Sequence, residues 1–170
     1  AVLMGAPMGG DALPWNAAFL IEPSGSMRAV RKVELPNSDV FDERRTFRSA
    51  GAATPPLSFR GFRLGVQICE DMWHGRVSRD LADEMADVLI VLNGSPYEGG
   101  KNELRVRHAR ERVRSTGLPL IYVNQVGGQD ELVFDGGSFV MNTEGSPVMM
   151  RAFEADVMRI VLRRTATGQA

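Results

Sequence analysis

Cys69, the single cysteine of the chain, is the residue whose type and setting best suit covalent chemistry. It follows an alternating run at 63–68 that predicts a short buried strand, and the run at 76–86 after it has helical spacing. A thiol at such a strand-to-helix junction is presented for reaction, and backbone N–H groups after it can face a developing oxyanion. A neighbouring cation would lower the pKa of the thiol and favour the nucleophilic thiolate. Taken alone, the position fits a small buried packing residue equally well.

Other residues that could do chemistry carry weaker patterns. His74 and His108 are far apart in sequence and neither has a metal-ligand spacing, so the sequence predicts no metal site. A G-x-S-x-G elbow is absent from the sequence, and a Cys-His pair would need one of the two histidines to fold back onto Cys69. The glycine pairs at 127–128 and 136–137 lack phosphate-loop spacing and are predicted to form tight turns.

The elements that must position Cys69 alternate between strands and helices in the middle of the chain. A β-meander is predicted at 2–4, 16–21 and 27–33, followed by loop at 35–39 and 42–48. The other predicted elements are helices at 76–86 and 102–115, loops at 93–100 and 126–137, and strands at 63–68, 88–92, 118–123, 138–141, 148–152 and 157–162. This order predicts an α/β sandwich that contains mixed sheets.

Composition limits the classes of partner. The 170 residues, 44% of them hydrophobic, can bury the core of one domain. The 20 basic and 21 acidic residues are interspersed, so we expect neither a nucleic-acid nor a membrane partner. Because the sequence has no apolar run of about 20 residues and no signal-peptide pattern, we expect a cytoplasmic protein. A lone cysteine cannot form an internal disulfide, which agrees with a reducing compartment.

Three blocks of sequence, read together, resemble one family. The first is Lys-Val-Glu-Leu-Pro-Asn at 32–37 with the run 40–47 after it, and the second is Ile-Cys-Glu-Asp-Met-Trp at 68–73. The third combines Asn-Gly-Ser-Pro-Tyr at 93–97, Lys101 and the long stretch 122–138. In this order they resemble the nitrilase or carbon-nitrogen hydrolase superfamily, and within it the glutaminase domain of glutamine-dependent NAD synthetases, over nearly the whole chain.

The resemblance implies covalent hydrolysis of an amide. Cys69 attacks the side-chain carboxamide of glutamine and forms a thioester while ammonia leaves, and water then releases glutamate. Lys32 stabilises the thiolate and the oxyanion, although in isolation it would be interpreted as a solvated surface lysine. Glu43 orients Lys32 or pairs with the leaving group, or is one more solvated carboxylate in a charged run.

The same resemblance implies a set of substrate-binding residues. Ser95 and Lys101, both expected in loops, match positions that hold the amino and carboxylate groups of glutamine, and an ammonium suits an α-carboxylate. Ser38 stands where relatives carry a tyrosine that contacts glutamine. Trp73 and Glu70, from the cysteine block, complete the predicted set.

The resemblance also implies how the chain relates to a whole enzyme. Residues 1–163 are expected to form an α-β-β-α sandwich that lacks its N-terminal strand and helix, with a tail at 164–170. The superfamily's general-base glutamate belongs to an earlier segment and has no match here, so the chain as given is expected to be impaired. No cofactor is expected in this domain, and ATP and magnesium are expected only in an absent synthetase domain.

The expected partners are L-glutamine, that synthetase domain and further copies of the chain in a homo-oligomer. Two other functions remain open from the sequence. One is a free-standing amidase of the same superfamily, and the other is a catalytically silent interaction subunit.

Overall fold

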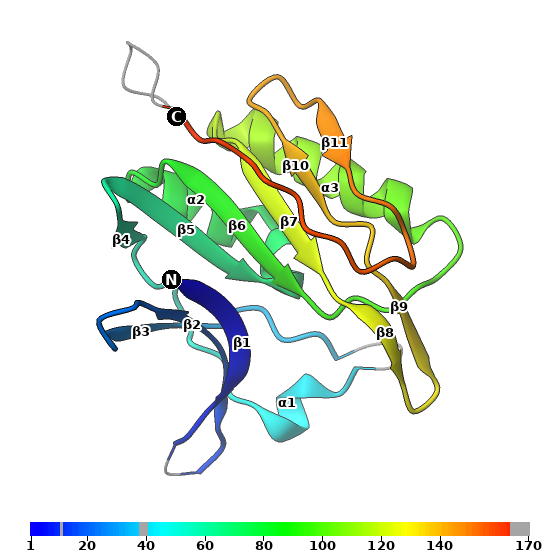
Figure 1. The fold of residues 1–170 in the computed structure, drawn as a ribbon. Coiled ribbons are helices and arrows are strands. Elements are labelled where there is room, and N and C mark those ends of the chain that lie inside the picture. Colours follow the sequence, from blue (N-terminus) through cyan, green and yellow to red (C-terminus); the bar gives the residue numbers. More distant parts are fainter. Residues whose placement is uncertain (11, 38–40, 164–170) are drawn as a thin grey trace.

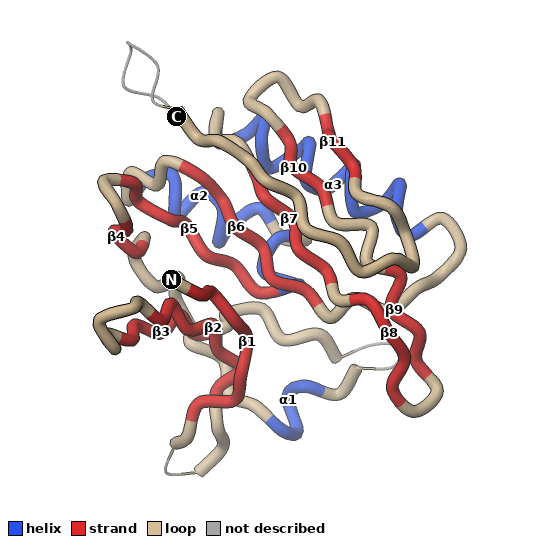
Figure 2. Tube along the Cα trace, viewed as in Figure 1, coloured by secondary structure: helices blue, strands red, loops and turns tan. Residues whose placement is uncertain are grey.

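The computed structural model describes residues 1–10, 12–37 and 41–163, and most of their strands lie in two sheets (Figures 1 and 2). The smaller sheet is antiparallel and consists of β1 (Val2–Met8), β2 (Trp15–Ile21) and β3 (Met27–Arg31). The turn between β2 and β3 contains Gly25 at φ 86, a backbone conformation that favours glycine. The predicted β-meander is confirmed, and β1 extends beyond the predicted segment.

The larger sheet has six strands and is mixed. Its order is β11 (Pro147–Met149), β10 (Phe139–Met141), β7 (Leu120–Asn124), β6 (Val88–Asn93), β5 (Phe62–Ile68) and β4 (Leu57–Phe59). The central strands β5, β6 and β7 are parallel, and the outer pairings are antiparallel. Parallel neighbours need crossover connections, which here contain α2 (Gly75–Asp83) and α3 (Lys101–Thr116). The prediction of a mixed α/β fold is confirmed.

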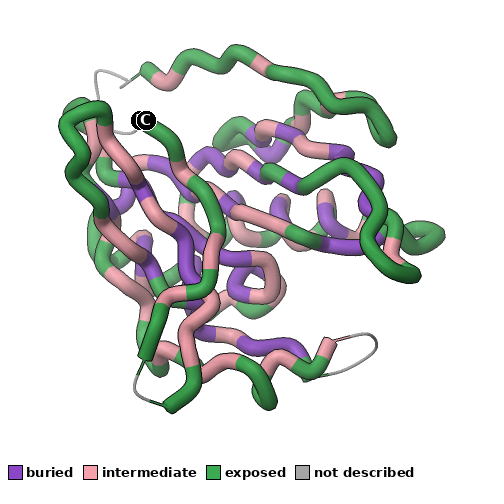
Figure 3. The backbone as a smooth tube through the Cα atoms, turned by 60° about the horizontal axis from the view of Figure 1, so that its bottom comes forward, coloured by how far each residue is buried: buried purple, intermediate pink, exposed green. Residues whose placement is uncertain are grey.

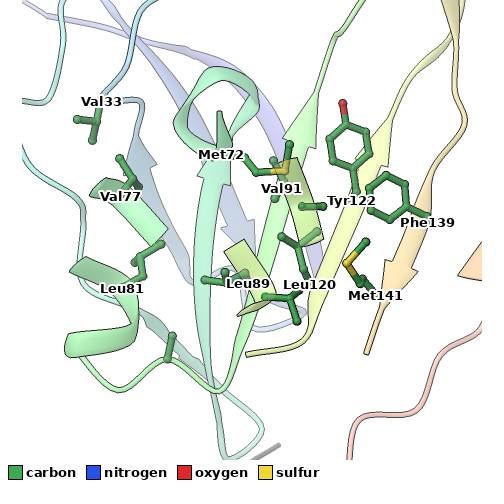
Figure 4. Close-up of a cluster of buried hydrophobic side chains, with 13 residues drawn as sticks. Val33, Met72, Val77, Leu81, Leu89, Val91, Leu120, Tyr122, Phe139 and Met141 are labelled. Atoms are coloured by element: carbon green, nitrogen blue, oxygen red, sulfur yellow. The ribbon is translucent and has the colours of Figure 1, made fainter. Parts of the chain in front are cut away.

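Helices α2 and α3 cover one face of the six-stranded sheet (Figure 1). Their apolar residues recur at a spacing of four, as in Val77 and Leu81, and therefore line one side of each helix. These side chains pack on β6 and β7 in the cluster drawn in Figure 4. Within it the rings of Tyr122 and Phe139 stack with centroids 4.8 Å apart. This cluster is the larger core of the protein.

The opposite face of the six-stranded sheet packs against the three-stranded sheet. Leu20 and Val30 from the smaller sheet meet Val66, Ile68 and Val88 from the larger one in a second buried cluster. The described residues therefore form three layers: helices, six-stranded sheet and three-stranded sheet. No described helix is long and apolar enough to cross a membrane.

Two segments predicted as loops contain regular structure. The stretch 42–48 includes the one-turn helix α1 (Glu43–Thr46), which buries no residue and so leaves no apolar period in the sequence. The stretch 126–137 contains a hairpin of β8 (Val126–Gln129) and β9 (Leu132–Asp135). The glycine pair at 127–128 lies inside β8, so the turn predicted there is wrong. The pair at 136–137 does turn, with φ 66 and 59.

The sequence also misses β4 and predicts one strand that does not form. Residues 157–162 carry enough apolar residues to suggest a strand, yet they pair with no other strand among the described residues. A strand needs a partner for its backbone hydrogen-bonding groups, and a sequence pattern cannot supply one. Most of this segment is exposed, as Figure 3 shows for the end of the described chain.

Candidate active site

Cys69 occupies a strained turn at the carboxyl end of β5. Strand β5 ends at Ile68, and the 3-10 helix η1 (Cys69–Met72) begins at the cysteine itself. The φ angle of Cys69 is 47°, in the left-handed region that residues with a Cβ rarely adopt. Such strain persists where surrounding contacts enforce it, and it concentrates at functional sites. The predicted strand-to-helix junction is confirmed, and the thiol stands at its tip.

A buried carboxylate, that of Asp71, holds this turn. One of its oxygens, Oδ2, accepts a hydrogen bond from the backbone N–H of Ile68 at 3.0 Å. Its other oxygen, Oδ1, accepts from the N–H groups of Val33 at 3.0 Å and Glu34 at 2.8 Å. Asp71 is 1% exposed, so these three donors replace the water that the carboxylate has lost.

Lys32 is buried and paired with Glu43. The residue directly follows β3, and its side chain is 1% exposed. This burial rules out the alternative of a solvated surface lysine. The ammonium Nζ donates to both carboxylate oxygens of Glu43 at 2.8 Å, and Asn16 Nδ2 donates to the same carboxylate at 3.5 Å. The charge of Lys32 is therefore neutralised and its position is fixed, as a buried ion requires.

Cys69, Lys32 and Glu43 line one cleft of about 390 Å³, a size suited to a small ligand. The cleft lies where the smaller sheet meets the carboxyl ends of the parallel strands. Its other lining residues are Gly5, Asn16, Phe41, Ile68, Leu92, Asn93, Gly94, Val123, Asn124 and Gln125. The three predicted catalytic residues, which are far apart in the sequence, thus line the same cleft.

Effects of opposite sign act on the pKa of the Cys69 thiol. Burial raises the pKa of Cys69 from 9.0 to about 11, because a thiolate in this setting lacks solvation. Lys32 lowers that pKa, and the carboxylates of Glu70, Glu43 and Asp71 raise it. The lowering expected from a nearby cation is present, but burial outweighs it and the pKa is raised overall. The thiol is neutral at neutral pH and needs a base to become a nucleophile.

Ser95 and Lys101 lie outside the cleft in this structure. Ser95 is 2% exposed, and its backbone N–H donates to Asn124 Oδ1 at 2.9 Å while its hydroxyl and carbonyl accept from Arg105. Lys101 is the first residue of α3 rather than a loop residue, and its ammonium pairs with Glu98 at 3.3 Å. Their predicted contact with substrate stays a prediction.

The remaining predicted binding residues also have other neighbours. The Glu70 carboxylate lies 3.3 Å from His74 Nε2, and Trp73 packs against the helix core with its ring 4.7 Å from that of His108. Neither lines the cleft. Ser38 lies outside the described residues.

Several polar residues near the site have no role predicted from the sequence. Asn93 and Asn124 each end a parallel strand, and they pair in register at the sheet edge next to Cys69. The rule that ligands bind at the carboxyl ends of parallel strands could have drawn attention to them. Arg105, fully buried, donates to both oxygens of Asp135 at 2.9 Å. Because the sequence of this helix is rich in charged residues, the sequence alone would predict that Arg105 faces solvent.

The family model described as carbon-nitrogen hydrolase matches residues 1–165. This chain belongs to the carbon-nitrogen hydrolase family. Among the relatives of this carbon-nitrogen hydrolase is the glutamine-dependent NAD(+) synthetase of Rhodobacter capsulatus, 44% identical over 167 residues, which are 98% of this chain and 30% of the synthetase. The synthetase of the same name from Thermotoga maritima is 36% identical over 164 residues, 95% of this chain and 28% of its own length. The chain thus spans less than a third of each relative.

This carbon-nitrogen hydrolase is also similar to solved structures of a synthetase and of an amidase. The glutamine-dependent NAD+ synthetase from Acinetobacter baumannii, solved with ADP, matches with a TM-score of 0.84 and 36% identity over 91% of this chain and 30% of that one. An amidase from Nesterenkonia sp. AN1 matches with a TM-score of 0.73 and 25% identity over 88% of this chain and 58% of that one. In that amidase structure, acrylamide has added to the active site cysteine.

Proposed function

We propose that this carbon-nitrogen hydrolase chain is part of a glutaminase, with Cys69 as nucleophile and Lys32 as its cationic partner. The observation that carries the proposal is one cleft in which a strained cysteine and a fully buried lysine meet. The similarity to glutamine-dependent NAD synthetases over nearly the whole chain supports glutamine as the substrate.

In the proposed reaction the sulfur of Cys69 bonds to the carboxamide carbon of glutamine, and the carbonyl electrons move to oxygen. The thiol proton passes through a general base to the departing nitrogen, which leaves as ammonia and gives a thioester. Water then attacks the thioester, releases glutamate and returns the proton to sulfur. Lys32 Nζ stabilises the negative charge on sulfur and oxygen, since a fixed cation in a water-poor cleft acts strongly.

Glu43 is proposed to orient Lys32 instead of acting as the base. Both of its oxygens already accept from the ammonium, and it is the one carboxylate that lines the cleft among the described residues. We therefore propose that the general base is a glutamate that the described residues do not supply, as the superfamily pattern implies. Ser95, Lys101, Ser38, Trp73 and Glu70 remain proposed substrate-binding residues. Of these, Ser95, Lys101, Trp73 and Glu70 do not line the cleft, so contact with glutamine would need their rearrangement.

The ammonia is proposed to serve ATP-dependent NAD synthesis in a synthetase domain of the same protein. In this proposal residues 1–163 belong to the hydrolase domain and 164–170 to a tail. ATP and magnesium bind the synthetase domain, and the whole enzyme is a cytoplasmic homo-oligomer. A second candidate is a free-standing amidase, which the likeness to the Nesterenkonia enzyme favours at lower identity.

The test uses Cys69→Ser in the whole protein that carries this chain. We expect the variant to lose glutamine-supported NAD formation and to keep synthesis from added ammonia, because only the first needs the thiol. Equal loss of both activities would contradict the assignment. Hydrolysis of small aliphatic amides with no turnover of glutamine would favour the amidase instead.

A further inference from the structure

Asp71 connects the two segments that carry Cys69 and Lys32. Val33 and Glu34, whose N–H groups donate to Asp71 Oδ1, directly follow Lys32. Ile68, whose N–H donates to Asp71 Oδ2, directly precedes Cys69. One carboxylate thus bonds the backbone on the lysine side and the backbone on the cysteine side.

This bridge joins different parts of the fold. Lys32 follows β3 in the three-stranded sheet, and Cys69 follows β5 in the six-stranded sheet. The residues whose N–H groups it binds are 37 and 38 positions from Asp71 on the lysine side and three on the cysteine side. Buried hydrogen bonds to a charged acceptor are strong and directional, so they restrict how far the segments can separate.

We propose that Asp71 is a positioning residue, which holds the Lys32 ammonium close enough to Cys69 to stabilise negative charge on sulfur. The inference rests on the proposed function, in which that charge develops during attack. Asp71 does not line the cleft, so it acts through Lys32 and not by touching substrate.

A competing interpretation gives Asp71 no role beyond its own charge. The two interpretations predict opposite changes in the thiolate fraction of Cys69 when Asp71 is replaced. The carboxylate charge of Asp71 raises the pKa of Cys69, and Lys32 lowers that pKa by more. Removing the charge alone therefore makes the thiolate more abundant. Removing the bridge lets Lys32 move away, which makes the thiolate scarcer. Glu43 and Glu70, the other charged groups that act on the thiol, stay unchanged in the test.

The experiment measures alkylation of Cys69 by iodoacetamide at one pH below the thiol pKa, in the whole protein, following the Cys69 peptide by mass spectrometry. We compare Asp71→Asn, Lys32→Met and the double variant with the wild type. At such a pH the rate follows the thiolate fraction, so one pKa unit changes it about tenfold. We expect Asp71→Asn to slow alkylation roughly three- to tenfold when Lys32 is present. In the Lys32→Met background the same change should speed it, because only the charge effect remains.

Asp83→Asn is the matched control, since Asp83 is an exposed carboxylate on α2, and it should leave the rate unchanged. Asp71→Glu keeps the charge and displaces the carboxylate by one methylene, so it should also slow alkylation and serves if Asp71→Asn does not fold. The proposal is overturned if Asp71→Asn speeds alkylation, leaves it unchanged, or slows it equally in both backgrounds. Glutamine is not used, so this result and the Cys69→Ser result can fail independently.

Discussion

The Cys69 thiol lines the cleft at intermediate exposure, and the Lys32 side chain, which lines the same cleft, is almost fully buried. The Lys32 ammonium donates to both carboxylate oxygens of Glu43. Desolvation raises the pKa of Cys69 to about 11, although the Lys32 ammonium lowers it. A protonated thiol protects the nucleophile from oxidation and alkylation, since these reactions need the thiolate. Deprotonation must then accompany substrate attack, which fits a general base that acts on the thiol.

Ionisation of Asp71 should make the free energy of unfolding depend on pH. Burial raises its pKa from 3.8 to about 6, although its backbone hydrogen bonds and Lys32 lower it. The folded protein thus binds a proton more tightly than the unfolded chain between these values. Stability from this group is present below the unfolded pKa and is lost as the pH rises through the folded pKa. Between about pH 4.5 and pH 7 we expect the wild type to lose about 2 kcal/mol relative to Asp71→Asn.

Urea denaturation of both proteins across this range measures that difference. The comparison cancels the other carboxyl groups, which titrate in both proteins. A stability difference that stays constant with pH would show that Asp71 ionises normally in the folded protein.

At the scale of elements, α3 does more than cover the sheet. Its buried Arg105 bonds the Asp135 carboxylate at the end of β9 and the carbonyl oxygens of Ser95 and Pro96 in the loop that leads into the helix. Asn124, at the end of β7, bonds the same loop through Ser95. The polar network fixes the segments that end beside the cleft, and it satisfies backbone groups that would otherwise be buried without partners.

Arg105→Met should destabilise the protein by about 3–5 kcal/mol, because it leaves the Asp135 carboxylate buried without its partner. Arg107→Met, an exposed position on the same helix, should change stability by no more than about 0.5 kcal/mol. Thermal or urea unfolding measures both. Adding Asp135→Leu to Arg105→Met should recover part of the loss, and a double variant as unstable as the sum of the single ones would contradict the pairing.

At the scale of the whole molecule, the site lies between two sheets. Cys69 follows β5 of the six-stranded sheet, and Lys32 follows β3 of the three-stranded sheet. Packing between the two sheets, which Figure 1 shows as ribbons, therefore sets the distance between the two residues. A small residue makes that packing close: Ala18 in β2 is fully buried in the cluster between the sheets. Leu20 in the same strand extends the contact to Val66 and its neighbours.

Leu20→Ala should lower the free energy of unfolding by about 2–5 kcal/mol, since it opens a cavity between the sheets. Met27→Ala removes a similar volume from the same sheet at a side chain that is 61% exposed, and should change it by no more than about 0.5 kcal/mol. Urea denaturation distinguishes the two. Equal effects of both changes would show that the three-stranded sheet does not pack as described.

Local periodicity and chain order were enough to predict the meander, the alternation of strands and helices, and the junction that presents Cys69. The burial of Lys32 beside Glu43 and the binding of Asp71 to backbone groups on both sides of the site follow instead from how the layers pack. The same holds for the thiol pKa, which depends on how much solvent the surrounding layers remove. Strand formation at residues 157–162 also depends on packing, because these residues have an apolar pattern but pair with no strand in the described chain. Contacts between different elements depend on how the layers pack, and one sequence does not encode that packing in any local pattern.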